Sequence, residues 1–427
     1  MLPPLPKLER PWIASRAEAE RRLAAFLPRA GRDYAAQRNF DRGPAERANV
    51  SVLSPYVRHR VLTEAELLAA VLERHSPSGA EKFISEIFWR TYWKGWLETH
   101  PAAWTRYRAA LDERLTELAA SPARRRTYAD AMAGSTGFDA FDSWSRELVG
   151  TNYLHNHARM WFASIWIFTL GLPWELGADF FMRHLLDGDP ASNTLSWRWV
   201  AGLQTRGKSY RATRDNIGRY TGGRFALARP LAAVAPALDE PSIPIRALPA
   251  LPTAVGAEAT LFVLHDDDLH GDLADLPPGV RGVCALRATA CRSPLAVSAA
   301  VAAFEDALAG ESVRRIADAG SAVDLGLISA DEGSEPGGAG GAQAAGRALC
   351  AAAAACGATR IVVAFAPVGP VREAIDSLRP IAVAGGATCV EIARRYDAVS
   401  WPAATRGFFN LRSRIPAILA ELGIGSG

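Results

Sequence analysis

The sequence predicts a helical domain followed by a Rossmann-like α/β domain with a mostly parallel sheet. Helix-start signals dominate before residue 250 and strand signals are sparse there, whereas short apolar runs alternate with Ala-rich stretches beyond it. Such alternation is typical of an α/β layer. The chain has 427 residues, which exceeds one ordinary hydrophobic core, so two domains are expected.

Capping boxes mark helix starts in the first half, which we assign to residues 1–230. Ser15 with Glu18 precedes a predicted helix from Arg16 to Phe26, and Thr63 with Glu66 precedes a second apolar stretch. In a capping box each of the two side chains satisfies a backbone N–H of the first helical turn. These signals support an all-helical domain.

A Pro- and Ala-rich stretch, residues 231–255, is the predicted linker, because its prolines block regular structure. Residues 256–427 form the predicted α/β domain. Its apolar runs, predicted as strands, are Thr260–Leu264, Val280–Leu286, Val323–Ile328, Arg360–Phe365 and Thr388–Ile392. The Gly-rich tract Glu332–Gly341 is expected to be a flexible loop without a phosphate-binding role, since its glycines lack GxGxxG spacing after a strand.

Composition excludes several classes of protein. The hydrophobic content of 49% and charged content of 22% are those of an ordinary globular protein, and no apolar run is long enough to span a bilayer. The first residues lack a signal-peptide apolar core, so we expect a cytoplasmic protein. The net charge of +3 does not by itself indicate DNA binding. The cysteines, Cys284, Cys291, Cys350, Cys356 and Cys389, lack paired CxxC spacing, and no disulfides are expected.

The segment from Asp187 to Trp199 concentrates chemical groups. It holds two carboxylates, an amide and two indoles, and Arg159 lies upstream. A buried Asp must be paired, and Asp187 with Arg159 would be a charge-assisted pair. An isoalloxazine ring needs hydrogen-bond partners along its polar edge, and the amide of Asn193 both donates and accepts. The set suits a buried flavin; a helix start with acidic caps and core tryptophans is the alternative.

Further motifs occur in a fixed order. They are Tyr34 with Gln37–Phe40, Ser51–Pro55, Phe83–Arg90, Thr136–Phe138, Asn156–Met160 and Asp187–Trp199. In this order and spacing, residues from about Tyr34 to Phe225 resemble the flavin-binding helical domain of the DNA photolyase/cryptochrome family. The resemblance implies FAD as cofactor. It also implies no iron–sulfur cluster, because the cysteine ligands that one bacterial branch uses are missing from this half.

The resemblance implies a set of flavin contacts at matching positions. These are Tyr34, Ser51, Leu53, Ser54, Phe83, Arg90, Asn156, Arg159, Asp187, Asp189 and Asn193. Ser51 and Ser54, near a predicted helix start, have hydroxyls and backbone N–H groups suited to the cofactor's diphosphate. Phe83 stands where the family usually has Trp, so stacking is kept while an indole donor is lost.

A helix stripe predicts the DNA-facing chemistry. Glu86, Trp89 and Trp93 recur at spacings of three and four, which places them on one face, although such a stripe is also typical of core. The resemblance implies a cavity for a flipped-out pyrimidine dimer, in which Glu86 hydrogen-bonds the damaged base and indoles offset its unstacking. The implied DNA and lesion contacts are Arg38, Glu86, Trp89, His157, Met160 and Trp199.

The electron supply is only partly matched. Trp197 and Trp174 fall at the proximal and middle positions of the family's tryptophan triad, but the distal position lies near Ser121 and Pro122, where no aromatic residue stands. Candidates for a replacement are Trp104, Tyr107, Tyr128 and Trp166. All of these rings also fit a plain core.

The resemblance implies a light-driven cyclobutane pyrimidine dimer photolyase, in which excited reduced FAD donates an electron to the dimer. Asn193 and Met160 favour this branch of the family. We expect DNA with pyrimidine dimers as partner, a monomer, no membrane and no metal, and we assign no residue to an antenna pigment. A flavin photoreceptor without repair activity is the main alternative, and an interaction module that has lost flavin is a third.

The domain order departs from the family, in which an α/β domain usually precedes the flavin domain. The fragment from Phe262 to His270 is similar to the first strand and Asp-Leu turn of that antenna domain. A permuted domain order is therefore a hypothesis. His265, Asp266, Asp268 and His270 are an alternative metal set, but a polar loop at the end of a strand is the preferred interpretation.

Overall fold

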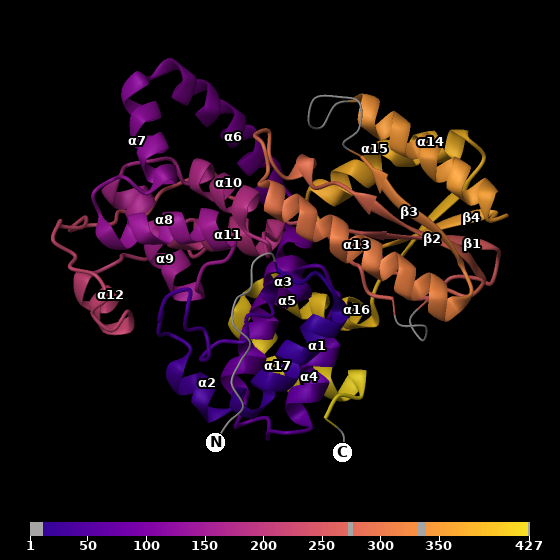
Figure 1. The fold of residues 1–427 in the computed structure, drawn as a ribbon, viewed down its shortest axis with the longest axis horizontal. Coiled ribbons are helices and arrows are strands. Elements are labelled where there is room, and N and C mark those ends of the chain that lie inside the picture. Colours follow the sequence, from indigo (N-terminus) through magenta and orange to yellow (C-terminus); the bar gives the residue numbers. More distant parts are fainter. Residues whose placement is uncertain (1–11, 272–275, 331–338, 426–427) are drawn as a thin grey trace.

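A computed structural model of the chain describes residues 12–271, 276–330 and 339–425. Helices make up the N-terminal half, and a five-stranded sheet with helices on both faces makes up most of the remainder (Figure 1). Within the described ranges, no helix is long and apolar enough to cross a bilayer.

From residue 12 onward, where the structure describes it, the N-terminal half contains twelve α-helices, in agreement with the predicted helical domain. They are α1 (Arg16–Phe26), α2 (Arg32–Gln37), α3 (Ser54–Arg58), α4 (Glu64–Leu72), α5 (Glu81–Thr99), α6 (Ala102–Ala120), α7 (Pro122–Ala133), α8 (Asp139–Thr151), α9 (Asn156–Ser164), α10 (Trp174–His184), α11 (Pro190–Val200) and α12 (Arg214–Tyr220). The first helix has the predicted bounds. No strand occurs among the described residues before Thr260.

The two predicted capping boxes differ. At α4 both halves form, because Thr63 accepts from the Glu66 backbone and the Glu66 carboxylate accepts from the Thr63 backbone. At α1 the Ser15 hydroxyl accepts from the Glu18 backbone at 3.2 Å. The Glu18 carboxylate instead binds the side chains of Arg21 and Arg22. Arginines one turn along the helix thus compete successfully for the carboxylate, and only half of that predicted box is present.

All five predicted strands are present in one parallel sheet. They are β1 (Thr260–His265), β2 (Val280–Arg287), β3 (Val323–Ser329), β4 (Arg360–Ala364) and β5 (Thr388–Ile392). Their order across the sheet is β3-β2-β1-β4-β5, so β1 lies at the centre. This is the order of doubly wound α/β folds. Every pairing between these strands is parallel, as predicted.

The two faces of the sheet have different covers. One face packs against α14 (Ala339–Ala355) and α15 (Pro370–Ala384) through apolar residues such as Val263 and Leu349. The other face packs against α13 (Ala299–Gly320). On this face, Phe262 and Leu264 of β1 share one hydrophobic core with α1, α3 and α5. The helical half therefore covers part of the sheet directly.

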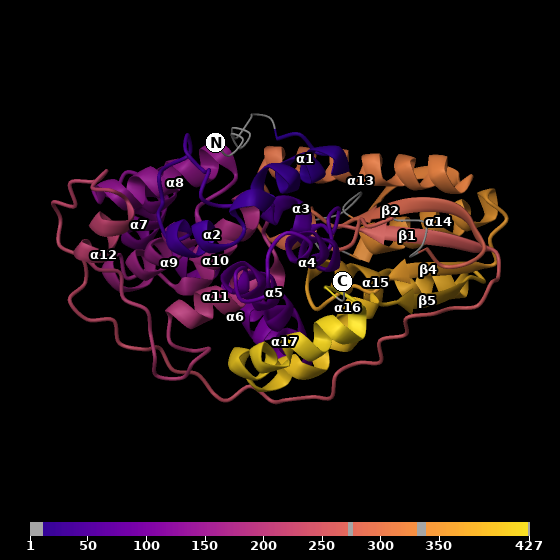
Figure 2. The same ribbon diagram turned by 90° about the horizontal axis from the view of Figure 1, so that it is seen from below.

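The segments around the sheet refine two expectations. Residues 332–338 of the predicted flexible loop lie outside the described residues, whereas its last three residues belong to α14. Residues 231–255, the predicted linker, contain neither helix nor strand, and Figure 2 shows them running along the molecule from the helical half to the sheet. Backbone hydrogen bonds hold this stretch, including Arg246 N to Thr99 O at 2.9 Å.

The chain returns to the helical half after β5. The last elements, α16 (Arg395–Ser400), η5 (Trp401–Arg406) and α17 (Phe408–Leu422), pack against α5 (Figures 1 and 2). Gly95 of α5 permits the contact, because a Cβ there would lie 2.8 Å from the Cβ of Ala404 and 3.0 Å from Trp401. The segment 395–422 lies in the range predicted as α/β domain, yet it packs on the helices.

A buried arginine joins the two halves. Arg58 is 2% exposed, and its guanidinium pairs with Asp267, which follows β1. The same guanidinium donates through Nε to the carbonyl of Gly188 at 2.9 Å, in the loop between α10 and α11. Burial alone would raise the pKa of Asp267, but the charge of Arg58 overrides it and lowers the pKa to about 2. Asp267 therefore stays ionised.

The neighbouring positions extend this network. Arg60 binds Asp397 of α16 at 2.6 Å and lies 3.4 Å from Asp268, whose second partner is Arg394 at 2.8 Å. Asp266 accepts from Arg287 at 2.8 Å. These aspartates thus bind guanidinium groups, and within the described ranges no three His, Cys, Asp or Glu side chains converge as metal ligands. The polar loop serves as an ion-pair junction between the halves.

We predict that Asp267→Asn destabilises the fold by about 3–5 kcal/mol, because it leaves the buried charge of Arg58 without its partner. Urea unfolding followed by circular dichroism measures the loss. Asp376→Asn is the matched control, since this carboxylate is 60% exposed and lies 3.5 Å from Arg372, and it should cost less than about 1 kcal/mol. Equal losses of unfolding free energy in the two variants would contradict the assignment of Asp267 as the partner of the buried Arg58.

Candidate functional site

The loop between α10 and α11 presents two carboxylates on opposite sides of Gly188. Asp189 caps α11, because its Oδ1 accepts from Ser192 N at 2.8 Å. Its Oδ2 lies 3.0 Å from Lys94 Nζ and 3.2 Å from Arg90 Nη1. Burial would raise the pKa of Asp189, but Lys94 and Arg90 hold it well below its usual range. Asp189 is therefore a fixed anion whose oxygens already bind protein donors.

The predicted pair of Asp187 and Arg159 is present. Arg159 Nη2 donates to Asp187 Oδ2 at 2.8 Å, and Arg159 Nε donates to the Leu154 carbonyl at 2.8 Å. The other oxygen, Asp187 Oδ1, is buried and has no hydrogen-bond partner in the protein. A buried acceptor without a donor is costly, so this oxygen is suited to an N–H group of a ligand.

Asn193 lies in α11 after these carboxylates and is 8% exposed. Its Nδ2 donates to the Ala178 carbonyl of α10 at 2.9 Å. The amide oxygen of Asn193 is the acceptor that this contact does not use. The contact with α10 fixes the orientation of the amide. Asn193 can therefore accept a hydrogen bond from a ring N–H, and the donor half of the amide is used within the protein.

The residues expected near the rest of the cofactor lie on α2, α3 and α5. Tyr34 is buried, with its ring edge-on to Phe83 at 5.1 Å. Ser54 is the first residue of α3, so the predicted helix start is present, and Ser51 Oγ accepts from Leu53 N at 3.4 Å. Tyr34, Leu53 and Phe83 are buried, whereas Ser51 and Ser54 are half-buried.

One backbone position in this region is strained. Val52 has φ of 54°, in the left-handed region that β-branched residues rarely adopt. Such strain costs about 1–3 kcal/mol and persists where the surroundings hold it in place. Val52 lies between Ser51 and Leu53, in the loop predicted to bind the diphosphate of the cofactor. This conformation could not be predicted from the sequence, because Val favours extended backbone.

A second charged pair faces this region from α5. Glu86 pairs with Arg38 at the end of α2, and both side chains are half-buried. Burial raises the pKa of Glu86, although the charge of Arg38 opposes the shift. Burial, together with the Glu86 carboxylate, also raises the pKa of Tyr34, which keeps its phenol protonated. Tyr34, Arg38 and Glu86 therefore form one cluster.

The expected DNA-facing aromatic residues are partly covered. Trp89 stacks on Phe408 of α17, with ring centroids 3.6 Å apart and an interplanar angle of 8°. Trp199 stacks on Tyr210 at 5.6 Å. His157 Nδ1 lies 3.0 Å from the Asn39 carbonyl, and burial lowers the pKa of this imidazole. Met160 is half-buried and Asn156 exposed.

The tryptophans predicted to supply electrons belong to two separate rows of rings. Trp197 is 2% exposed, and its ring centroid lies 6.2 Å from that of Trp166. The ring centroids of Trp166 and Tyr128 are 5.9 Å apart. Trp174 contacts Tyr107 at 5.6 Å, and Tyr107 contacts Trp104 at 5.4 Å. Trp166 and Tyr107 thus lie beside the two matched tryptophans, and Tyr128 and Trp104 lie one ring further along each row. Gly177 permits the first row, because a Cβ there would lie 2.3 Å from Trp197 and 2.9 Å from Trp166 Nε1.

Sequence reasoning missed two residues of the site. Lys94 is 2% exposed and neutralises Asp189, and its position four residues after Arg90 on one helix is a signal that was available. Tyr153 lies against the Arg159 guanidinium at 5.6 Å, and its pKa is raised by burial. It precedes the Asn156–Met160 segment and gave no sequence signal.

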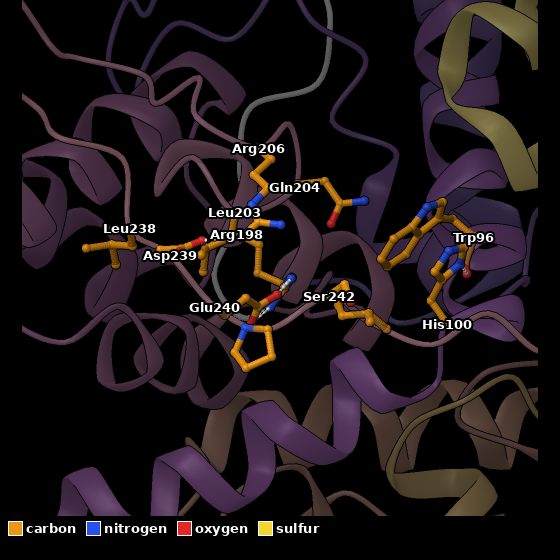
Figure 3. A pocket seen from close by; sticks show the side chains of 12 residues that line it. Trp96, His100, Arg198, Leu203, Gln204, Arg206, Leu238, Asp239, Glu240 and Ser242 are labelled. Carbon is orange, nitrogen blue, oxygen red and sulfur yellow. Dashed lines mark hydrogen bonds and ion pairs between the residues drawn. The ribbon is translucent and has the colours of Figure 1, made fainter.

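Two cavities lie apart from the predicted site residues. One of about 190 Å³ is lined by Trp96, His100, Gln204 and the Arg198–Glu240 ion pair, which Figure 3 shows between the end of α5 and the linker. Another, of about 560 Å³, lies between the sheet and the helical half, lined by residues that include Arg60, Phe262 and Tyr396. Neither is lined by any of the residues predicted to contact flavin or DNA.

Comparison with known proteins identifies the helical half. Residues 83–217 match the family described as the FAD binding domain of DNA photolyase. The chain is 36% identical over 160 residues to the deoxyribodipyrimidine photo-lyase of Streptomyces griseus, covering 36% of this chain and 32% of that protein. It is 29% identical over 210 residues to that of Vibrio cholerae, covering 47% and 42%. It is 37% identical over 183 residues to that of Thermus thermophilus, covering 42% and 40%.

A solved structure of a bacterial class III photolyase from Agrobacterium tumefaciens is 27% identical, with a TM-score of 0.41, and covers 49% of this chain and 43% of that one. The chain spans 32% to 42% of the length of the three curated relatives. The fold and the family match define a flavoprotein with an FAD-binding helical domain. By this match residues 83–217 belong to the FAD-binding domain of the DNA photolyase/cryptochrome family.

The residues present fit FAD. The buried Asp187 Oδ1 lacks a protein donor, and the oxygen of Asn193 lies on the next helix as a second acceptor. Together they match the N–H groups of a reduced isoalloxazine ring, while the adjacent Arg159 supplies positive charge. A helix start with acidic caps, the alternative interpretation, describes Asp189 but leaves the orphaned oxygen of Asp187 unexplained.

We predict that Asp187→Asn weakens FAD binding by roughly 10- to 100-fold, because it removes the charged acceptor and leaves Arg159 unpaired. Titration of apoprotein with FAD, followed by flavin fluorescence, measures the dissociation constant. Asp215→Asn, an exposed carboxylate on α12, is the control and should bind FAD as the parent does. Unchanged affinity in Asp187→Asn would contradict the assignment of this oxygen.

Proposed function

We propose that this protein repairs cyclobutane pyrimidine dimers in DNA under blue or near-UV light. The observation that carries the proposal is that the FAD-binding domain retains Asp187 paired with Arg159, with Glu86 paired with Arg38 on the neighbouring elements. The relatives named as deoxyribodipyrimidine photo-lyases support it. Bound reduced FAD would supply the photoexcited electron that splits the dimer.

Glu86 would recognise the dimer. Its carboxyl is half-buried with a raised pKa, so it is closer to protonation than an exposed glutamate and can donate to a pyrimidine carbonyl. Arg38 pairs with the Glu86 carboxylate and holds it in position. A DNA phosphate would compete with Glu86 for the Arg38 guanidinium. The proposed lesion walls are Trp89, Met160 and Trp199, with His157 beside the DNA backbone.

Phe408 stacks on one face of Trp89, and the rings of Tyr92 and Trp93 also contact it, with centroids 5.7 Å and 5.3 Å from its own. A ring held on one side is a rigid stacking platform, which favours base stacking by lowering its entropic cost. The proposed flavin contacts remain those of the family resemblance, from Tyr34 to Asn193. Arg90 and Asp189 would act mainly by fixing each other, since both bind protein groups.

We predict that illumination of the chemically reduced protein restores thymines in an oligonucleotide carrying one thymine dimer, whereas the dark sample restores none. Glu86→Ala should lower the repair yield per absorbed photon roughly 10- to 100-fold, as expected for the loss of a hydrogen bond to a charged group. Glu73→Ala, an exposed glutamate on the C-cap of α4, is the control.

A flavin photoreceptor is the second candidate function, and one observation favours it. The α/β half is joined to the flavin-domain turn through Arg58, which offers a path from the cofactor site to a possible output domain. Two results together would support the photoreceptor over the photolyase. The protein would bind FAD without restoring thymines under light, and the Glu86→Ala variant would bind FAD and respond to light as the parent does.

Electrons are proposed to pass from Tyr128 through Trp166 to Trp197 and then to the bound flavin, and an external thiol would reduce the oxidised Tyr128 in turn. The ring contacts of 6.2 Å and 5.9 Å support this order, and Tyr128 lies on α7, where Arg183 donates to its hydroxyl at 3.1 Å. In this route Trp166 would take the middle position in place of Trp174, and Tyr128 would take the missing distal position.

We predict that Trp166→Phe abolishes light-driven reduction of bound FAD by thiol, while dithionite still reduces it. Absorbance of oxidised flavin under illumination follows the reaction. Trp104→Phe is the matched control, because this ring is equally buried but belongs to the row of Trp174. Loss of reduction in Trp104→Phe alone would assign the route to that second row instead.

A further inference from the structure

The C-terminal helix α17 lies along the first half of α5, on the stripe that carries the proposed lesion contacts. Phe408, at its first position, stacks on Trp89 and meets Tyr92 at 6.0 Å. Arg412, one turn later, pairs with Glu81 at the start of α5. The two helices therefore run in opposite directions, side by side in both ribbon views (Figures 1 and 2).

Phe409 is the side chain that α17 leaves outside. It is 78% exposed, more than any other large hydrophobic residue among those described, and its ring lies 6.3 Å from that of Phe408. A single exposed phenylalanine is common on protein surfaces. Here, however, two ring contacts, Phe409 to Phe408 and Phe408 to Trp89, connect it to the proposed lesion wall.

The charge around Phe409 is positive. The stretch from Arg406 to Ala420 contains three arginines and no acidic residue. Within the described part of the chain, Arg412 pairs with Glu81, while Arg406 and Arg414 are exposed and pair with no carboxylate. An exposed ring with an unpaired guanidinium group before and after it along the chain is complementary to a nucleic acid strand, which offers base faces and phosphates.

We propose that α17 binds the DNA next to the flipped-out dimer. Phe409 stacks on a base beside the gap that the dimer leaves, and Arg406 and Arg414 bind phosphates of the same strand. The proposal rests on the proposed repair function and adds to it a DNA contact that lies outside the FAD-binding domain match, which ends at residue 217. The C-terminal segment thereby becomes part of the substrate site.

The arrangement has a physical advantage. Removing a dimer from the helix leaves neighbouring bases without a stacking partner, and an aromatic ring at that place recovers part of the lost energy. Leu411, Ile415 and Ile418 anchor α17 in the core, so Phe409 is held on a rigid element. Little conformational entropy is then lost on binding.

The test compares two substrates of different size. A dimer dinucleotide reaches only the lesion pocket, whereas a duplex oligonucleotide with one central thymine dimer also reaches α17. Phe409→Ala should weaken duplex binding roughly 5- to 100-fold and leave repair of the dinucleotide unchanged. Arg406→Gln with Arg414→Gln should lower the slope of log affinity against log salt by about 1.8. Val383→Ala, a 54% exposed residue on α15, is the control.

The outcomes separate the two proposals. If the parent protein repairs both substrates and Phe409→Ala binds the duplex as the parent does, α17 is not a DNA contact. If the parent repairs neither substrate, the proposed function itself fails. A Phe409→Ala variant that instead loses self-association in sedimentation, with duplex binding intact, overturns the DNA assignment in favour of a contact between copies of the chain.

Discussion

The structure depends most on the buried guanidinium of Arg58. It binds Asp267 after the central strand and the carbonyl of Gly188 in the loop that carries Asp187 and Asp189. One side chain thus fixes the α/β half and the loop between α10 and α11 relative to each other. A buried ion pair contributes net stability only if its remaining hydrogen-bonding groups are satisfied, and here the backbone carbonyls of Gly188 and Asp266 accept from the same guanidinium.

This junction explains why the two halves form one packed body. Phe262 and Leu264 of the central strand belong to the hydrophobic core of α1, α3 and α5, so the apolar and charged contacts coincide. The chain then crosses back after β5, and Arg60 binds Asp397 of α16 to hold that return. The flavin domain therefore borrows part of its interior from the sheet and from the C-terminal helices.

The candidate site consists of two charged pairs with different tasks. In the proposed function Arg159 and Asp187 would lie on the cofactor side, because one carboxylate oxygen has no partner within the protein. Arg38 and Glu86 would lie on the DNA side, and burial raises the pKa of the Glu86 carboxyl. The aromatic residues Trp89 and Phe408 join the helical domain to α17. Under this proposal separate ion pairs would recognise the cofactor and the substrate.

The sequence by itself determined the strands, the helix start at Ser54 and the pairing of Asp187 with Arg159, because local periodicity, capping and buried charge act over short stretches or demand a partner. Tertiary structure alone decided that Phe408 covers Trp89 and that Asp266, Asp267 and Asp268 form a junction with arginines. These contacts join residues up to hundreds of positions apart or select among competing partners, and no local pattern encodes such a choice.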